Sequence, residues 1–240
     1  ISNLPPETKV EIKIDTGMNR NGIMINEFNS ALGLIIENKL LLNGVFTHFA
    51  NAYIDDNSLY IQKEQFDLIK KNILQDSRFN NIRFHCSASS ALFRFDNSEY
   101  DLARVGIMSY GYIVLPDDCN RPAKLKPVMS LWGNRISTKH INKDDRVGYG
   151  GVFMADKDME ISTYDIGYGD GFLRLDENKK STIQDKRNIL GRISMNNLAV
   201  EGNDEKICVF DDAKELAKVH NTIPYEILCR IRPSIKKRII

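Results

Sequence analysis

The strongest constraint on the fold is a regular alternation of strand-like and helix-like segments over the first half of the chain. Short apolar segments alternate with longer ones whose apolar residues recur three and four positions apart. The strand-like segments are 10–14, 42–49, 82–87 and 102–111, and the helix-like segments are 23–38, 58–74 and 89–95. This alternation indicates βαβ units and a parallel sheet. The chain holds roughly four such units, whereas a complete (β/α)8 barrel has about eight.

The pattern changes near Lys126. From there on, short apolar runs are separated by turn residues, and helical spacing returns only at 212–220 and 223–231. Short strands bounded by turns are typical of a mostly antiparallel β domain. We therefore predict two domains: residues 1–125 form half of an α/β barrel, and residues 126–240 form an all-β domain.

The amino-acid composition argues against several classes of protein. Lys and Arg total 33, Asp and Glu total 32, and the formal net charge is +1, a balance that predicts no general affinity for nucleic acid or anionic membranes. No apolar run is long enough to span a bilayer, and no secretory signal is recognisable. The cysteines Cys86, Cys119, Cys208 and Cys229 form no CxxC pair, which indicates reduced thiols and no zinc site. We therefore expect a cytoplasmic protein without a metal.

Candidate functional residues gather where the predicted strands end, which is where α/β barrels place their active sites. In chain order they are Arg20, His48, Ser87, Ser89, Ser90, Arg104, Gly106 and Ile107. Hydroxyl and backbone N–H groups at a helix start can hold a phosphate, and two arginines with a histidine would surround a flat anionic ligand. From the residues alone, a lone histidine such as His48 is more often structural than functional, and Ser89 is first of all an N-cap.

Nine segments resemble, in order, the motif series of the alanine racemase family. They are KIDTGMNRNG, FTHFANA, HCSASSA, ARVGIMSYG, PVMSLWGNRI, VGYGGVF, IGYGDGF, ILGRISMNNLAV and TIPYEILCRI. The resemblance covers nearly the whole chain and implies the second half of a barrel that binds pyridoxal 5'-phosphate (PLP), followed by the family's C-terminal β domain. The implied activity is the interconversion of L- and D-alanine, which supplies D-alanine for bacterial peptidoglycan.

The resemblance assigns roles to the loop after the first strand. Arg20 would bind the substrate carboxylate and the ring hydroxyl of the cofactor. Lys13 corresponds to a family lysine that can be carbamylated, and together with Asp15 it would position Arg20. An unmodified Lys13 paired with Asp15 is the alternative.

The later strand ends would bind the cofactor. Arg104 would face the pyridine nitrogen of PLP and donate to it without transferring a proton, because a guanidinium stays protonated. His48 would hydrogen-bond to Arg104. Ser89, Gly106 and Ile107 would hold the phosphate.

The second domain would supply residues to a neighbouring molecule. Tyr149 would be one of two catalytic bases, with nearby cations and hydrogen bonds stabilising its phenolate. Tyr168 would line the substrate entrance, and Met195 would meet the substrate through its backbone N–H. In the family these residues reach the barrel of the partner subunit, which implies a homodimer with shared active sites. Without the motif, Tyr149 would be interpreted as a core aromatic residue.

The chain also departs from the family pattern. The family's PLP-binding lysine lies in a motif upstream of the first strand, and no segment here matches it. We therefore expect the sequence to be the C-terminal portion of a longer product and to be inactive alone. Asn19, Val105 and Asn196 stand where glycine, proline and aspartate are usual. A broad-spectrum racemase, a decarboxylase of basic amino acids or a non-catalytic remnant stay open as alternatives.

Overall fold

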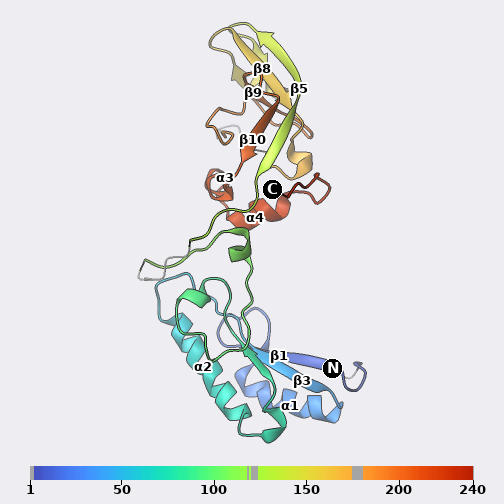
Figure 1. Cartoon of the computed structure of the whole chain (residues 1–240), viewed down its shortest axis with the longest axis vertical. Helices are drawn as coiled ribbons and strands as arrows, with labels where there is room; N and C mark the ends of the chain where they lie inside the picture. The colour runs from blue at the N-terminus through green and yellow to red at the C-terminus, as the bar shows by residue number, and fades with distance from the viewer. Residues whose placement is uncertain (1–2, 118, 120–123, 175–180, 240) are drawn as a thin grey trace. The chain divides into compact units, whose positions relative to one another are not determined.

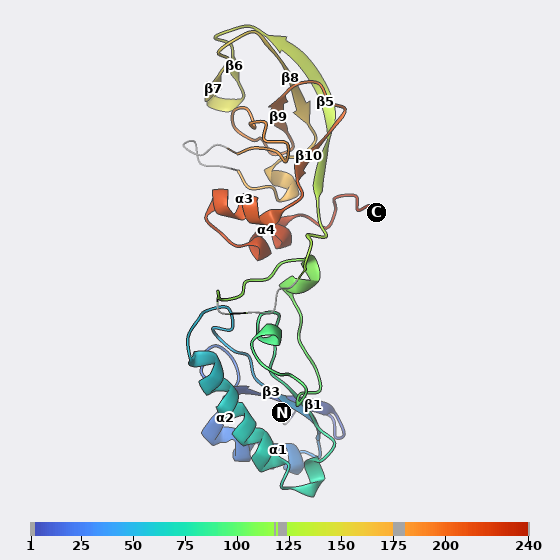
Figure 2. The ribbon, with the colours of Figure 1, turned by 60° about the vertical axis from the view of Figure 1, so that its left-hand side comes forward.

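The computed structural model describes residues 3–117, 119, 124–174 and 181–239. The chain divides into two compact units, Ile1–Leu125 and Lys126–Ile240, which are described separately (Figures 1 and 2).

The first unit is a parallel sheet with two helices against it. Its strands, in the spatial order β2-β1-β3-β4, are β2 (Ile23–Met24), β1 (Lys9–Asp15), β3 (Leu41–Phe46) and β4 (Arg83–His85). Its helices are α1 (Phe28–Glu37), α2 (Ser58–Ile73) and the short 3-10 helices η1 (Ile25–Glu27), η2 (Ser77–Phe79), η3 (Ala91–Phe93) and η4 (Ile107–Tyr110). Because α1 connects β1 to β3 and α2 connects β3 to β4, the first two of the predicted βαβ units are confirmed.

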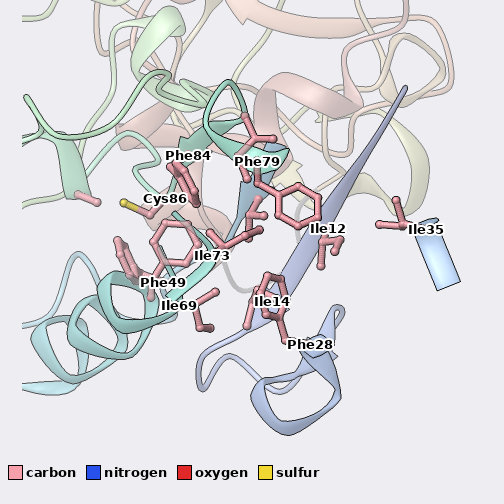
Figure 3. Packing of buried hydrophobic residues seen from close by; sticks show 14 of the residues in the cluster. Ile12, Ile14, Phe28, Ile35, Phe49, Ile69, Ile73, Phe79, Phe84 and Cys86 are labelled. Atoms are coloured by element: carbon pink, nitrogen blue, oxygen red, sulfur yellow. The ribbon is translucent and has the colours of Figure 1, made fainter. Parts of the chain in front are cut away.

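The two faces of this sheet differ in chemistry because successive strand residues point to opposite sides. On one face, Ile12 and Ile14 of β1, Val45 of β3 and Phe84 of β4 are buried in one hydrophobic cluster with residues of α1 and α2. Figure 3 shows Ile12, Ile14 and Phe84 in the same cluster as Ile69 of α2. The apolar face therefore fixes both the strand register and the helix positions.

The opposite face carries polar and charged residues in rows across the strands. The register aligns Glu11 with Gly44 and Gly44 with Arg83. Two residues further along, Lys13 aligns with Phe46, and Phe46 with His85. This charged face leads directly to the loops that carry the candidate site.

The segment predicted as a fourth strand, 102–111, is different in the structure. It makes a single parallel bridge between Ala88 and Arg104 and then enters η4. The physical reason is that the backbone N–H groups of Gly106 and Met108 donate to the hydroxyl of Ser89, at 3.2 and 3.4 Å, rather than to a neighbouring strand. The predicted helix at 89–95 is likewise only the 3-10 turn η3.

The second unit is built on an antiparallel sheet, as predicted. Its strands, in the order β10-β5-β8-β9, are β10 (Lys206–Phe210), β5 (Leu131–Ile141), β8 (Met159–Tyr164) and β9 (Leu198–Glu201). The remaining elements are the hairpin of β6 (Arg146–Val147) and β7 (Phe153–Met154), the 3-10 helices η5 (Tyr149–Gly151) and η6 (Tyr168–Asp170), and the helices α3 (Ala213–His220) and α4 (Pro224–Arg230). The two predicted C-terminal helices are thus present.

Three further features bear on function. Within the described ranges, no helix has both the length and the hydrophobicity of a bilayer-spanning segment. The same residues contain no group of three or more His, Cys, Asp or Glu side chains that could hold a metal ion. Cys86, Cys119, Cys208 and Cys229 are free thiols.

The packing of Phe66 in the core of the first unit leads to a prediction about stability. Phe66 of α2 is fully buried and contacts the rings of Phe84 and Tyr100. We expect Phe66→Ala to lower the free energy of unfolding of this unit by about 3–5 kcal/mol. Leu68→Ala on the same helix should change it by less than about 0.5 kcal/mol, because Leu68 is 59% exposed. Denaturant unfolding followed by far-UV circular dichroism measures both, and equal effects would contradict the packing described.

Candidate active site

Arg104 is the centre of the candidate site in the first unit. Its backbone N–H donates to the carbonyl of Ser87 at 2.9 Å, which places the side chain over the ends of β3 and β4. Nη1 donates to Nδ1 of His85 at 2.5 Å and to the His85 carbonyl at 3.1 Å. Nη2 donates to the carbonyls of Thr47 at 2.5 Å and Cys86 at 3.4 Å, and to Nδ1 of His48 at 3.4 Å. The guanidinium is therefore held by main-chain carbonyls and by two histidines.

One donor of this guanidinium faces no protein acceptor. Both Nη atoms of Arg104 are hydrogen-bonded, but none of the residues that the structure describes accepts from its Nε–H. The carbon of the guanidinium lies 4.9 Å from the centre of the Phe46 ring, a favourable cation–π distance. Burial lowers the pKa of Arg104, but an arginine remains protonated in proteins. The side chain is thus a fixed cation with one N–H available for a ligand.

Two histidines flank Arg104, and both are biased toward the neutral form. Burial lowers the pKa of His48, and the cations Arg104, Arg20 and Lys13 lower it further. Burial also lowers the pKa of His85, which stacks on Phe46 with ring centres 4.9 Å apart. Sequence reasoning selected His48 but missed His85, because His85 lies inside the predicted strand 82–87 rather than after it.

The loop that carries Arg20 is organised by Asp15. The carboxylate accepts from the backbone N–H groups of Gly17, Asn19 and Arg20, at 2.9, 3.0 and 3.2 Å. Although burial raises the pKa of Asp15, these hydrogen bonds lower it below the ordinary value. Asn19 adopts φ +55°, a left-handed conformation that asparagine tolerates and glycine favours. Asp15 therefore positions Arg20 through the main chain.

Lys13 lies in β1 on the charged face. Burial lowers its pKa, as do the neighbouring cations Arg20 and Arg104, while Asp15 opposes them. No hydrogen bond or ion pair among the described residues joins Lys13 or Asp15 to the guanidinium of Arg20. An unmodified Lys13 is therefore a like charge near Arg20. In the part of the chain that the structure describes, no ion pair joins Lys13 to Asp15.

A buried polar network that the sequence did not reveal joins the loops after β1 and β3. The hydroxyls of Thr16 and Thr47 lie 2.8 Å apart. Gln62 of α2 donates to the Thr16 hydroxyl at 3.4 Å and accepts from the backbone N–H of Ala50 at 2.9 Å. The helix thereby holds the two loops that carry Arg20 and His48 at one edge of the sheet.

The residues predicted to hold a phosphate lie together. The Ser89 hydroxyl accepts from Gly106 and Met108, which places it against the start of η4. A Cβ built on Gly106 would meet no atom within 4 Å, so packing does not require glycine there and the space above this backbone is open. Ile107 is buried. The other two serines of this segment donate to other protein groups. The Ser90 hydroxyl donates to the Val114 carbonyl at 2.8 Å, and the Ser87 hydroxyl donates to the side chain of Asn97.

In the second unit, glycines let two loops pack closely. A Cβ on Gly167 or Gly169 would lie 2.4 or 2.6 Å from the Met195 carbonyl, and the Gly169 N–H donates to that carbonyl at 2.7 Å. This contact holds Tyr168 beside Met195. Both side chains are exposed, at 46% and 56%.

Tyr149 lies in a neighbouring loop of the same unit. It is flanked by Gly148 and Gly150 with φ +75° and +72°, and a Cβ on Gly150 would lie 3.2 Å from the guanidinium of Arg192. Tyr149 is 71% exposed, so the interpretation of this residue as a core aromatic is wrong. The phenol is presented outward from a glycine-rich turn.

The chain thus combines an α/β unit that carries cations at its strand edge with an antiparallel β unit that presents an outward-facing tyrosine. The family model of the alanine racemase N-terminal domain matches residues 2–114, and that of the alanine racemase C-terminal domain matches residues 128–239. An alanine racemase of a Nitratiruptor species is 45% identical over 231 residues. The chain therefore belongs to the alanine racemase family, whose members are PLP-dependent isomerases.

The other comparisons agree and show how much of the family's length is present. The match to the Nitratiruptor enzyme covers 95% of this chain and 68% of the relative. An alanine racemase of Campylobacter jejuni subsp. jejuni serotype O:2 is 40% identical over 240 residues, 100% of this chain and 70% of the relative. The alanine racemase structure from Clostridium difficile 630 matches with a TM-score of 0.83 at 27% identity, over 95% of this chain but only 63% of that one. The chain thus spans about two thirds of its relatives.

The role of Asp15 can be tested by hydrogen exchange. We expect Asp15→Asn to speed amide exchange of Gly17, Asn19 and Arg20 on the order of tenfold. The acceptor loses its negative charge, and one of its two oxygens becomes an amide donor. Since the folded-state pKa is lowered, the wild-type protection should be complete above the ordinary carboxyl pKa of about 3.9. It should disappear only as the pH falls through the lowered value.

Asp56→Asn is the matched control for this experiment. The Asp56 carboxylate accepts from the backbone N–H of Ser58 at 2.9 Å, away from the site. This variant should speed exchange at Ser58 and leave the Asp15 loop unchanged. Unchanged exchange at Gly17 and Asn19 in Asp15→Asn would contradict the role given to Asp15.

Proposed function

We propose that the complete protein containing this chain interconverts L- and D-alanine with PLP as cofactor. The identity to relatives named alanine racemase, 45% over 231 residues, carries this proposal. We place the enzyme in the cytoplasm, where it would supply D-alanine for peptidoglycan. A broad-spectrum racemase, a basic amino-acid decarboxylase and a non-catalytic remnant are outcomes of the test below.

The described residues of the first unit fit the cofactor. The unpartnered Nε–H of Arg104 provides a donor for a ring nitrogen, and the open space at Gly106 allows a phosphate to approach the backbone. Ser89, Gly106 and Ile107 would hold that phosphate, while Arg20 would contact the ring hydroxyl and the substrate carboxylate. PLP, when bound, withdraws electrons from the α-carbon of an amino acid.

Arg104 would limit that withdrawal. A guanidinium donates a hydrogen bond without giving up its proton, so the ring nitrogen would remain unprotonated. The negative charge that forms when the α-proton leaves would then be stabilised only in part, which disfavours side reactions such as transamination. His48, held neutral beside Arg104, would accept from the guanidinium and keep it in place.

Tyr149 would move the proton on one face of the α-carbon. Racemisation requires a base on each face, and the family's second base is the lysine of the upstream motif. Tyr168 would line the substrate entrance, and the backbone N–H of Met195, which donates to none of the described residues, would meet the substrate. We propose a homodimer in which these residues serve the site of the partner subunit.

The assay of the complete gene product tests this function. With PLP added, we expect D-alanine to form from L-alanine, and Tyr149→Phe to lower kcat by at least about 100-fold because it removes the proton-transferring hydroxyl. Tyr225→Phe makes the same change in the same unit outside the proposed site and should keep wild-type activity. Carbon dioxide release without racemisation would favour the decarboxylase, and failure to bind PLP would favour the remnant.

Carbamylation of Lys13 is a second testable part of the proposal. An uncharged amine adds CO₂ to give a carbamate anion and a proton, and the lowered pKa of Lys13 increases the uncharged fraction. The product would attract Arg20 instead of repelling it. We expect isotope-labelled CO₂ to give a carbamate NMR signal that is absent in Lys13→Arg and retained in Lys9→Arg, a control on the same strand. Lys13→Arg should also raise the KM for alanine, and a wild-type protein without the signal would refute carbamylation.

A further inference from the structure

Glu11 lies on β1 and reaches across the central strand β3 to β4. Its Oε1 accepts from Nη2 of Arg83 at 2.6 Å, and its Oε2 lies 3.1 Å from Nε2 of His85. The residue between Glu11 and Arg83 in the strand register is Gly44. A Cβ on Gly44 would lie 3.0 Å from Oε1 of Glu11 and 2.9 Å from the Arg83 carbonyl. The missing side chain at Gly44 therefore makes room for a contact between two strands that are not neighbours.

The partners of His85 determine which ring nitrogen carries its proton. Arg104 can only donate, so Nδ1 of His85, at 2.5 Å from Nη1, must be the acceptor. The proton of the neutral ring is then on Nε2, where it is donated to Glu11. Burial raises the pKa of Glu11, but hydrogen bonds and charges from His85 and Arg83 outweigh it and lower the pKa overall. Glu11 is thus an ionised acceptor on the far side of the histidine.

We propose that Glu11 is a positioning residue: by accepting from Nε2 of His85, it fixes the histidine tautomer that accepts from Arg104 and so sets the direction of the guanidinium. The contacts form one chain in the order Arg83, Glu11, His85, Arg104. This inference deepens the proposed function and rests on it for the role of Arg104 toward the cofactor. Without the carboxylate, His85 is free to carry its proton on Nδ1. That proton would face an arginine donor and turn the guanidinium away.

The wild-type protein provides the first test. Two-bond proton–nitrogen NMR correlations of isotope-labelled complete protein, assigned with His85→Gln, should show Nε2 protonated and Nδ1 unprotonated near neutral pH. A His85 ring protonated on Nδ1 would overturn the proposal. This measurement requires neither a variant at Glu11 nor catalytic activity.

Glu11→Gln provides the second test. An amide has one acceptor where Arg83 and His85 need two, so the tautomer of His85 should become mixed. The pKa of His85 should also fall, because the carboxylate that raises it is lost while the cations Arg104 and Arg83 remain. Glu64→Gln on the exposed side of α2 is the matched control and should change neither property. An unchanged tautomer in Glu11→Gln would overturn the proposal.

Kinetics of the PLP-loaded complete protein test whether Glu11 also affects catalysis. We expect Glu11→Gln to lower kcat on the order of tenfold, because a displaced positioning group costs rate even at a small misplacement, with little change in the KM for alanine. Equal kcat values in Glu11→Gln and wild type would refute a positioning role. A wild-type protein without racemase activity would instead refute the proposed function, and the tautomer result would still decide whether Glu11 controls His85.

Discussion

The placement of the Arg104 guanidinium is the constraint on which the rest of the first unit's site depends. A partly buried cation is unfavourable unless its N–H groups find acceptors. Here carbonyls at the ends of β3 and β4 accept from both Nη groups and leave Nε–H for a ligand. Among the described residues, no carboxylate pairs directly with this guanidinium. Its full positive charge therefore remains in the site. That charge contributes to keeping His48 and His85 neutral, and neutral imidazoles are able to accept from it. The charged guanidinium favours neutral imidazoles, and the neutral imidazoles accept hydrogen bonds from the guanidinium.

The apolar face of the sheet makes this arrangement possible. Strand side chains alternate with a period of two, so a register shift of one residue would exchange the two faces. The core against α1 and α2 buries Ile12, Ile14 and Phe84. Their burial therefore fixes the position of the charged face on the other side of the sheet. The site geometry follows from hydrophobic packing on the other side of the same strands.

The sequence predicted the parallel sheet, the two long helices and the antiparallel β unit, because these depend on local periodicity. It also selected Arg104 and His48 from their places at strand ends, since parallel strands end at one edge. It could not reveal the contact of Glu11 with His85, which are 74 residues apart and meet only through the strand register. The prediction of a strand at 102–111 was wrong. The segment has the composition of a strand, but backbone N–H groups that would pair with a neighbouring strand donate to the Ser89 hydroxyl instead.

The carboxylates near the site do not neutralise its cations, and this shapes what it can bind. The charge of Asp15 is directed to the backbone N–H groups of its own loop, and the charge of Glu11 is directed to Arg83 and His85. Arg20 and Arg104 are thus left with a positive field at the strand edge, and Lys13 adds to it when protonated. Opposite charges in a partly buried site attract strongly, so a ligand that carries both a phosphate and a carboxylate would complete the charge balance that the protein itself leaves open.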